Sequence, residues 1–301
     1  MDYAPPPGPP PSTEPPPPQW APAPERSHTD GLYNEASEVD YERAEAFCAT
    51  YPLDPPKLIP SAAIERIQEH GCGAWGLEWP NNPRFFGNLQ TDLKSGLAGA
   101  WRVRTEKGCK DCCLLSDLPI MGGMYDVKGK RGVYYEVKIH KMEGVIAVGT
   151  ACKPYPSFRM PGWNRQSAAL HLDDLRKFFE DPDGGRDYDS PLKPDSIYPG
   201  CIIGCGYEFS SGALFFTYNG ARLTDAFKGI YVPRIAQDVY AAIGVDGENE
   251  LEVNFGSAGF VWKEGNDWAW RVEGHVGQMI GAQGSGSAGD DQLPAYTRFG
   301  G

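Results

Sequence analysis

The stretch Gly212-Ala-Leu-Phe-Phe-Thr-Tyr-Asn-Gly-Ala-Arg-Leu223 decides the fold class of this chain. Over residues 214–218, apolar and aromatic side chains follow the two-residue period of a β-strand, in which neighbours belong to opposite faces. Asn219-Gly220 then supplies the two residues that adopt positive φ in a type I′ hairpin turn. The stretch therefore predicts a β-hairpin in which Phe216 is a core residue.

The same pattern of short apolar runs and turn residues extends on both sides of this hairpin. From about Trp75 onward, short apolar or alternating runs are separated by Gly, Pro, Asn and Asp. This pattern is typical of an antiparallel sandwich or barrel and not of βαβ units. Further strands are predicted at 132–139, 144–150, 202–209, 239–245 and 251–255. The body of the chain is therefore expected to be all-β.

Two short helices are expected ahead of this body. Residues 38–50 are mostly polar and carry Ala44, Phe47 and Cys48 at helical spacing. Ser61 opens a second helical run that ends before Gly71.

Both ends of the chain have compositions that disfavour a packed core. Twelve of the 28 prolines fall within the first 25 residues, which predicts an extended, polyproline-like arm. Residues 284–289 are glycine, serine and alanine, with almost nothing to bury. The expected organisation is a disordered arm at 1–38, a helical extension at 39–72, the β-domain at 73–265 and a flexible tail at 266–301.

Composition excludes several classes of function. The 301 residues, 41% of them hydrophobic, suffice for one main core. A net charge of −12 disfavours nucleic acids and anionic lipids as partners. The sequence shows no apolar run of membrane-spanning length, no signal peptide and no Asn-x-Ser/Thr sequon, and its eight cysteines are scattered. We therefore expect a cytoplasmic monomer.

No residue cluster in the sequence points to catalysis or to a cofactor. Cys109-x-x-Cys112-Cys113 could be half of a zinc site, but no second Cys-x-x-Cys or His pair accompanies it. Asp173-Asp174 and Asp181-Pro-Asp183 are interpreted as solvated loop faces. Nucleophile elbows, His-Glu-x-x-His and phosphate loops are all missing, so we expect a protein that is not an enzyme and holds no metal.

Six motifs in the β-body occur in an order that resembles the SPRY domain. They are Val133-Tyr-Tyr-Glu-Val137, Ile146-Ala-Val-Gly149, Ile203-Gly-Cys-Gly206, Leu214-Phe-Phe-Thr-Tyr-Asn-Gly220, Tyr231-Val-Pro-Arg234 and Val253-Asn-Phe-Gly256. The resemblance implies a bent antiparallel β-sandwich, similar to a jelly roll, that binds proteins through loops at one end.

A narrower resemblance rests on three other segments, Ile67-Gln-Glu-His-Gly-Cys-Gly-Ala-Trp75, Leu115-Ser-Asp-Leu-Pro119 and Lys153-Pro-Tyr-Pro-Ser-Phe-Arg-Met-Pro-Gly162. They are similar to fungal SPRY adaptors that recruit a WW-domain HECT ubiquitin ligase at endosomes and the vacuole. The resemblance implies that a PY motif binds the ligase while the SPRY domain engages cargo or sorting partners. Such adaptors commonly carry an N-terminal membrane span. No span is apparent here, so we expect a cytoplasmic protein that others recruit to endosomal or vacuolar membranes.

A candidate ligase contact lies near the C-terminus. Leu293-Pro294-Ala-Tyr296 fits the Leu/Pro-Pro-x-Tyr form of the PY motif. An extended proline packs into the aromatic groove of a WW domain, and the tyrosine fills an adjacent pocket. Two alternatives stay open beside the adaptor hypothesis. One is a stand-alone SPRY binding module or substrate receptor of a multi-subunit ligase, and the other is a lectin-like carbohydrate binder.

Three segments are candidates for reading the partner of the SPRY domain. One is 153–163, which is too rich in proline for a central strand, and the others are the charged excursion 173–189 and the turn after Tyr218. Their candidate contact residues are Tyr155, Phe158, Arg159, Trp163, Tyr218 and Asn219, of types common in interfaces. Some of the aromatic side chains in 153–163 are expected to pack inward and hold the segment in place.

Overall fold

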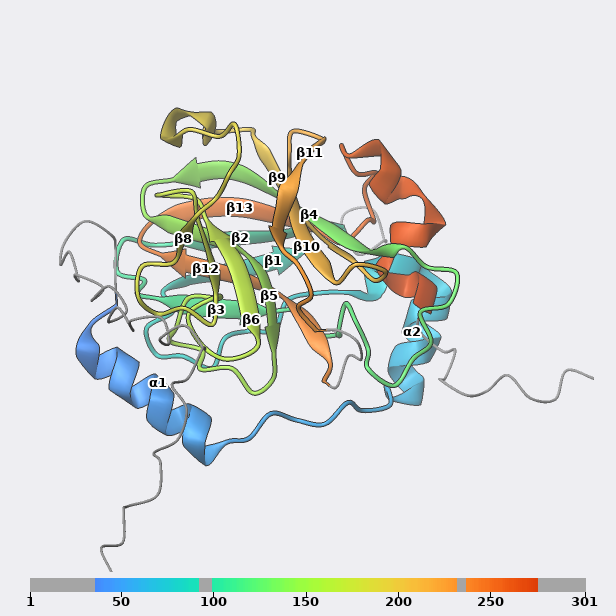
Figure 1. Ribbon diagram of the computed structural model, residues 1–301, viewed down its shortest axis with the longest axis horizontal. Coiled ribbons are helices and arrows are strands. Elements are labelled where there is room, and N and C mark those ends of the chain that lie inside the picture. The colour runs from blue at the N-terminus through green and yellow to red at the C-terminus, as the bar shows by residue number, and fades with distance from the viewer. Residues whose placement is uncertain (1–35, 92–98, 232–236, 276–301) are drawn as a thin grey trace, which may run out of the picture. The chain divides into compact units, whose positions relative to one another are not determined.

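The computed structural model describes residues 36–91, 99–231 and 237–275, in which two β-sheets pack face to face (Figure 1). Every strand pair in both sheets is antiparallel. The first sheet has the order β1 (Gly87–Thr91), β2 (Trp101–Thr105), β13 (Asn249–Asn254), β4 (Gly132–Met142), β9 (Ile202–Glu208), β10 (Ala213–Tyr218) and β11 (Ala221–Phe227). The second has the order β3 (Cys112–Leu115), β12 (Val239–Asp246), β5 (Val145–Cys152), β6 (Ser167–His171), β7 (Arg176–Phe179) and β8 (Arg186–Asp187). The predicted all-β sandwich is confirmed.

The hairpin that decides the fold is present as expected. Asn219 and Gly220 have φ values of 47° and 81°, and the turn they form joins β10 to β11. A Cβ atom on Gly220 would lie 2.7 Å from the carbonyl oxygen of Val261, so glycine is required for packing as well as for backbone conformation. Phe216 is fully buried in the core between the sheets.

The outer face of the first sheet is also covered. Tyr134 and Phe215 point away from the main core and pack with Phe260, Trp262 and Trp270 from the segment after β13. The rings of Phe215 and Trp270 meet edge to face with centroids 5.6 Å apart. Trp270 and Val272 are buried, and the described structure continues to His275, past the expected tail boundary at 265.

The two short helices have the predicted bounds, α1 at Glu38–Thr50 and α2 at Ser61–His70. Ser37 caps α1 because its side chain accepts a hydrogen bond from the backbone N–H of Asp40. The five predicted strands beyond the hairpin correspond to β4, β5, β9, β12 and β13, with small shifts at their ends. Strands β1–β3 and β6–β8 were not predicted, and β7 and β8 lie inside the charged excursion 173–189. No helix in the described part of the chain is long and apolar enough to cross a membrane.

Candidate interaction site

A groove opens where the edges of the two sheets come together. β11 is the last strand of the first sheet, and β7 is next to the last strand of the second. The groove has a volume of about 590 Å³ and is called here the β7–β11 groove. It is lined by Gln166, Lys177, Phe179, Glu180, Arg186, Ala226, Phe227, Lys228, Gly229, Ile230 and Tyr231.

The floor of the β7–β11 groove is aromatic and aliphatic. Phe179 of β7 and Phe227 of β11 lie with ring centroids 5.6 Å apart, and both side chains are half-buried. Ile230 is buried, and its carbonyl oxygen accepts a hydrogen bond from the Tyr207 hydroxyl at 2.5 Å. The Tyr231 hydroxyl lies 3.1 Å from the Thr150 hydroxyl, which anchors that wall to β5. The floor is therefore a fixed apolar surface.

The rim of the groove carries more positive than negative charge. Arg186 and Lys228 have side chains 69% and 75% exposed. Among the described residues, each forms one long ion pair, Arg186 with Asp181 at 3.9 Å and Lys228 with Asp225 at 3.6 Å. Such exposed pairs exchange readily with other anions. In a chain of net charge −12, this rim is a local basic site.

Lys177 and its neighbours close the free edge of β11. The ammonium of Lys177 donates a hydrogen bond to the carbonyl oxygen of Ala226 at 2.8 Å, and burial lowers its pKa. The Tyr188 hydroxyl donates to the carbonyl oxygen of Thr224. Because side chains already occupy these edge carbonyls, addition of a further strand is disfavoured. A ligand would bind through side chains seated on the floor and rim.

The structure assigns the buried members of the 153–163 segment to the scaffold. Tyr155, Arg159 and Trp163 are 7%, 1% and 4% exposed, which is too little for direct contact with a partner. The Tyr155 hydroxyl donates to the carbonyl oxygen of Met160 at 2.6 Å, and the Arg159 Nε donates to Asn164 Oδ1 at 3.0 Å. Trp163 packs with Val145, Ala147, Met160, Ala169 and Phe178 on the outer face of the second sheet. The hypothesis that these three side chains are contact residues is corrected accordingly, because they hold the proline-rich segment on the sheet.

The other candidate contact residues lie closer to the surface. Phe158 is half-buried, with the guanidinium of Arg43 4.5 Å above its ring. The Tyr218 hydroxyl donates to the carbonyl oxygen of Ser196 at 2.8 Å, and Asn219 Nδ2 donates to the Tyr198 hydroxyl at 3.2 Å. None of these residues lines the β7–β11 groove.

The excursion 173–189 does reach the groove, with Lys177, Phe179, Glu180 and Arg186. Residues 226–231, which form the facing wall, were missed by sequence reasoning. In the sequence, Ala226 and Phe227 are an apolar pair between Asp225 and Lys228, just after the predicted hairpin, which gives little indication of a site.

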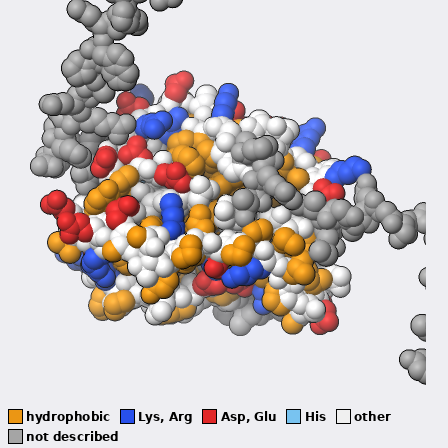
Figure 2. Space-filling model, turned by 60° about the horizontal axis from the view of Figure 1, so that its bottom comes forward, with side chains coloured by type: hydrophobic (Ala, Val, Ile, Leu, Met, Phe, Trp, Pro, Cys, Tyr) orange, Lys and Arg blue, Asp and Glu red, His pale blue; other side chains and the backbone are white. Residues whose placement is uncertain are grey.

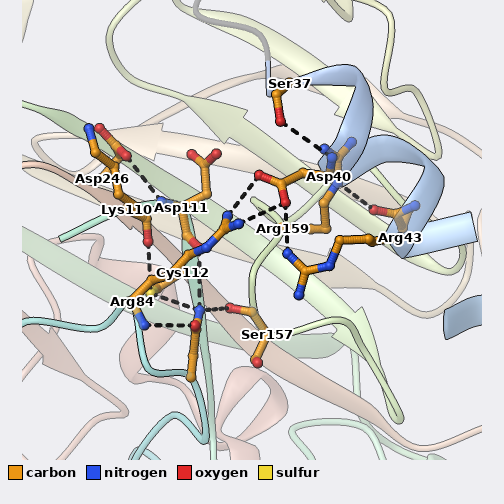
Figure 3. Close-up of polar contacts among 12 residues, drawn as sticks. Ser37, Asp40, Arg43, Arg84, Lys110, Asp111, Cys112, Ser157, Arg159 and Asp246 are labelled. Atoms are coloured by element: carbon orange, nitrogen blue, oxygen red, sulfur yellow. Dashed lines mark hydrogen bonds and ion pairs between the residues drawn. The ribbon is translucent and has the colours of Figure 1, made fainter.

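A polar network fastens α1 to the sandwich (Figure 3). Asp40 accepts two hydrogen bonds from Arg84, at 2.7 Å and 2.8 Å, and a third from Arg43 at 3.0 Å. The paired Arg84 lowers the pKa of Asp40. Only Asp40 and Ala44 of α1 are buried, so charge and hydrogen bonding, more than apolar burial, hold this helix.

Asp111 lies in the same network without a counter-ion at hydrogen-bond distance among the described residues. Its backbone N–H donates to Asp246 at 3.0 Å. Burial, reinforced by the negative charge of Asp246, raises the pKa of the Asp111 carboxyl to about 6. A raised carboxyl pKa means that the folded state favours the protonated form. The protonated Asp111 carboxyl therefore contributes to the stability of the fold. This contribution is complete below pH ~4 and is lost as the pH rises through about 6.

Asp111→Asn is therefore expected to stabilise the protein at pH above ~7, by about 1–2 kcal/mol, because it removes a half-buried charge. Urea unfolding near pH ~7.5 and ~5.5 would measure the effect, which should shrink at the lower pH. Asp117→Asn, at a carboxylate that pairs with Arg66 on the surface, is the control and should show no such gain. A loss of stability at the higher pH would show that the Asp111 carboxylate is stabilised where it lies.

The cysteines near this network are buried. Cys112 accepts a hydrogen bond from Asn82 Nδ2 at 3.1 Å and donates to the carbonyl oxygen of Lys110 at 2.9 Å. Cys109 and Cys113 are also buried. In the described ranges, no three His, Cys, Asp or Glu side chains gather closely enough to hold a metal ion.

Comparisons with known proteins give a consistent picture. Residues 132–258 match the model of the SPRY domain. Protein ssh4 of Sclerotinia sclerotiorum is 30% identical over 249 residues, which cover 82% of this chain and 42% of that protein. Protein ssh4 of Neurospora crassa is 32% identical over 277 residues, which cover 89% of this chain and 48% of that protein. This chain thus spans less than half the length of these relatives.

A SPRY domain-containing protein of Schizosaccharomyces pombe is 33% identical over 174 residues, which cover 57% of this chain and 41% of that protein. Among solved structures, a human SPRY domain is 22% identical, with a TM-score of 0.40, and the match covers 60% of this chain and 96% of that one. The SPRY domain of human HERC1 is 13% identical, with a TM-score of 0.38, and the match covers 51% of this chain and 87% of that one.

Proposed function

Because residues 132–258 form a SPRY domain, a protein-interaction module, we propose that this protein is an adaptor that binds cargo or sorting proteins and brings them to a WW-domain HECT ubiquitin ligase. The similarity to the ssh4 proteins over most of the chain supports an adaptor role. In this proposal the sandwich holds the cargo and the C-terminal segment contacts the ligase. The protein acts in the cytoplasm, at the surface of endosomal or vacuolar membranes.

The β7–β11 groove is the observation that supports cargo binding by the sandwich. A rigid apolar floor between Phe179 and Phe227 accepts one or two apolar side chains. The weakly paired Arg186 and Lys228 on its rim attract carboxylates. The groove therefore fits a protein segment in which an apolar side chain is flanked by Asp or Glu.

The ligase-binding half rests on Leu293, Pro294 and Tyr296, which lie outside the described residues. The motif supports the proposal by its chemistry, a proline and a tyrosine at the spacing that WW domains bind. One short peptide of this type binds with micromolar affinity, about −7 to −8 kcal/mol. Effective recruitment would then depend on avidity from several WW domains.

The groove is tested by selecting ligands from a displayed library of random peptides with the full chain. Selected peptides are expected to carry an apolar residue next to Asp or Glu. The double variant Arg186→Glu with Lys228→Glu should lower the affinity for these peptides by more than about tenfold, because it reverses the charge of the rim. Titration of the purified variant with the selected peptides measures the effect.

Lys107→Glu with Lys138→Glu is the matched control, because it makes the same change in net charge at exposed residues outside the groove. At physiological salt, this control should leave the affinity within about twofold of the original chain, because salt screens exposed charges that lie away from the binding site. Equal losses in the two double variants would show that net charge, and not the groove, determines binding. Selected peptides without acidic residues would also contradict the assignment.

A further inference from the structure

The 51–60 linker between α1 and α2 has the sequence Tyr51-Pro-Leu-Asp-Pro-Pro-Lys-Leu-Ile-Pro60 and contains neither helix nor strand. Figure 1 shows it as an extended segment along the lower edge of the molecule. Its prolines fix φ near −65° and keep the residues before them out of the helical region. Pro60 has φ −56° and ψ 144°, close to polyproline II values. The linker is thus an extended, polyproline-type segment.

Burial along the linker repeats every three residues. Leu53 and Pro56 are half-buried and Ile59 is buried, whereas the residues between them are exposed. A polyproline II helix has three residues per turn, so this repeat means that one of its three faces contacts the sandwich. The other two faces are open to solvent.

Hydrogen bonds hold the linker in this orientation. The backbone N–H of Asp54 donates to the carbonyl oxygen of Lys153 at 2.9 Å, and that of Lys57 donates to Asp238 Oδ2 at 3.0 Å. The N–H of Ile59 donates to the Tyr125 hydroxyl at 2.8 Å. The extended conformation is therefore fixed before any partner arrives, which lowers the entropy cost of binding.

The open faces carry Pro52, Pro55 and Lys57, a Pro-x-x-Pro-x-Lys pattern. Leu58 is 55% exposed beside them. Within the described ranges, Lys57 pairs with Asp54 alone, at 2.7 Å, and both side chains are more than half exposed, so an external carboxylate can replace Asp54. Figure 2 brings the bottom of the Figure 1 view forward and shows hydrophobic side chains exposed among charged ones.

We propose that the 51–60 linker is a preformed docking site for an SH3-type domain. The aromatic groove of such a domain packs on the two prolines of a Pro-x-x-Pro segment and leaves the third face of the polyproline helix free. Here that third face is the one that already contacts the sandwich. Acidic residues beside the aromatic groove would pair with Lys57. A WW domain fits less well, because Pro55-Pro56 is followed by Lys57 and Leu58, with no tyrosine.

The full chain is tested against an array of purified SH3 and WW domains, and each positive domain is titrated against variants. We expect at least one SH3 domain to bind with a Kd in the micromolar range. Pro52→Ala with Pro55→Ala should weaken binding at least tenfold, and Lys57→Glu should do the same without removing any proline. The melting temperature of each variant verifies that it remains folded.

Pro191→Ala with Pro194→Ala is the matched control. These prolines are exposed and have the same Pro-x-x-Pro spacing, but Pro194 begins a short 3-10 helix, so the segment is not a polyproline helix. This control should bind like the original chain. Equal binding by all variants would overturn the proposal, because the proline-rich residues 1–38 or another segment would then be the ligand. Binding by WW domains alone, or by no SH3 domain, would overturn it as well.

Discussion

Trp163→Ala is expected to lower the free energy of unfolding by about 3–5 kcal/mol, the range for removing a buried aromatic ring. Trp163 is 4% exposed and packs with Met160, Ala169 and Phe178, and the guanidinium of Arg159 lies 4.4 Å from its ring. Its removal would leave a cavity and expose the buried Arg159. Chemical denaturation of the full chain, monitored by fluorescence, measures the loss.

Trp268→Ala is the matched control for this prediction. The same side chain is removed there, but Trp268 is 59% exposed, so the expected loss is within about 1 kcal/mol. Phe158→Ala, in the same segment as Trp163, should also cost less because Phe158 is only half-buried. A loss below about 1 kcal/mol for Trp163→Ala would contradict its scaffold role and return it to the candidate contact residues.

Tyr296→Ala is expected to abolish binding of the C-terminal tail to isolated WW domains. The tyrosine fills the pocket beside the proline groove, and the other aromatic residue of the tail, Phe299, does not have the Pro-x-Tyr spacing to replace that contact. Titration of tail peptides covering residues 288–301 into purified WW domains measures the effect. The full-length variant should melt like the original chain, since Tyr296 lies outside residues 132–258, which match the SPRY domain.

Thr297→Ala in the same peptide is the control and should bind normally, because it lies just past the motif. Equal affinity of the original and Tyr296→Ala peptides would remove the ligase contact from the proposed function. The SPRY domain would then be better interpreted as a stand-alone binding module.

Local patterns in the sequence were enough to predict much of the sandwich. In β10 and β11 the alternation and the Asn219-Gly220 turn are both local, so the hairpin could be predicted without knowledge of its neighbours. The bounds of α1 and α2 followed from their periodicity and flanking residues. The aromatic segment around Trp270 was assigned to the tail because its partners, Tyr134 and Phe215, are distant in sequence.

The candidate site could be predicted only in part, because its residues are also distant from one another in the sequence. The β7–β11 groove brings Gln166, residues 177–186 and residues 226–231 together through the order of strands in two sheets. Composition marked residues 153–163 as rich in interface-type side chains, but aromatic rings suit cores and interfaces equally. Whether Tyr155 and Trp163 face inward depends on the small residues of the second sheet beneath them, Ala147 and Ala169 among them.

The central claim is that one chain holds cargo in the sandwich and the ligase at the tail, and proximity labelling in the native cell tests it most directly. Three forms would be compared: the intact chain, the chain without residues 290–301, and the Arg186→Glu with Lys228→Glu variant. We expect removal of the tail to eliminate labelling of a WW-domain ligase while cargo labelling persists. The groove variant should show the opposite pattern. Identical sets of labelled proteins from all three forms would contradict the account.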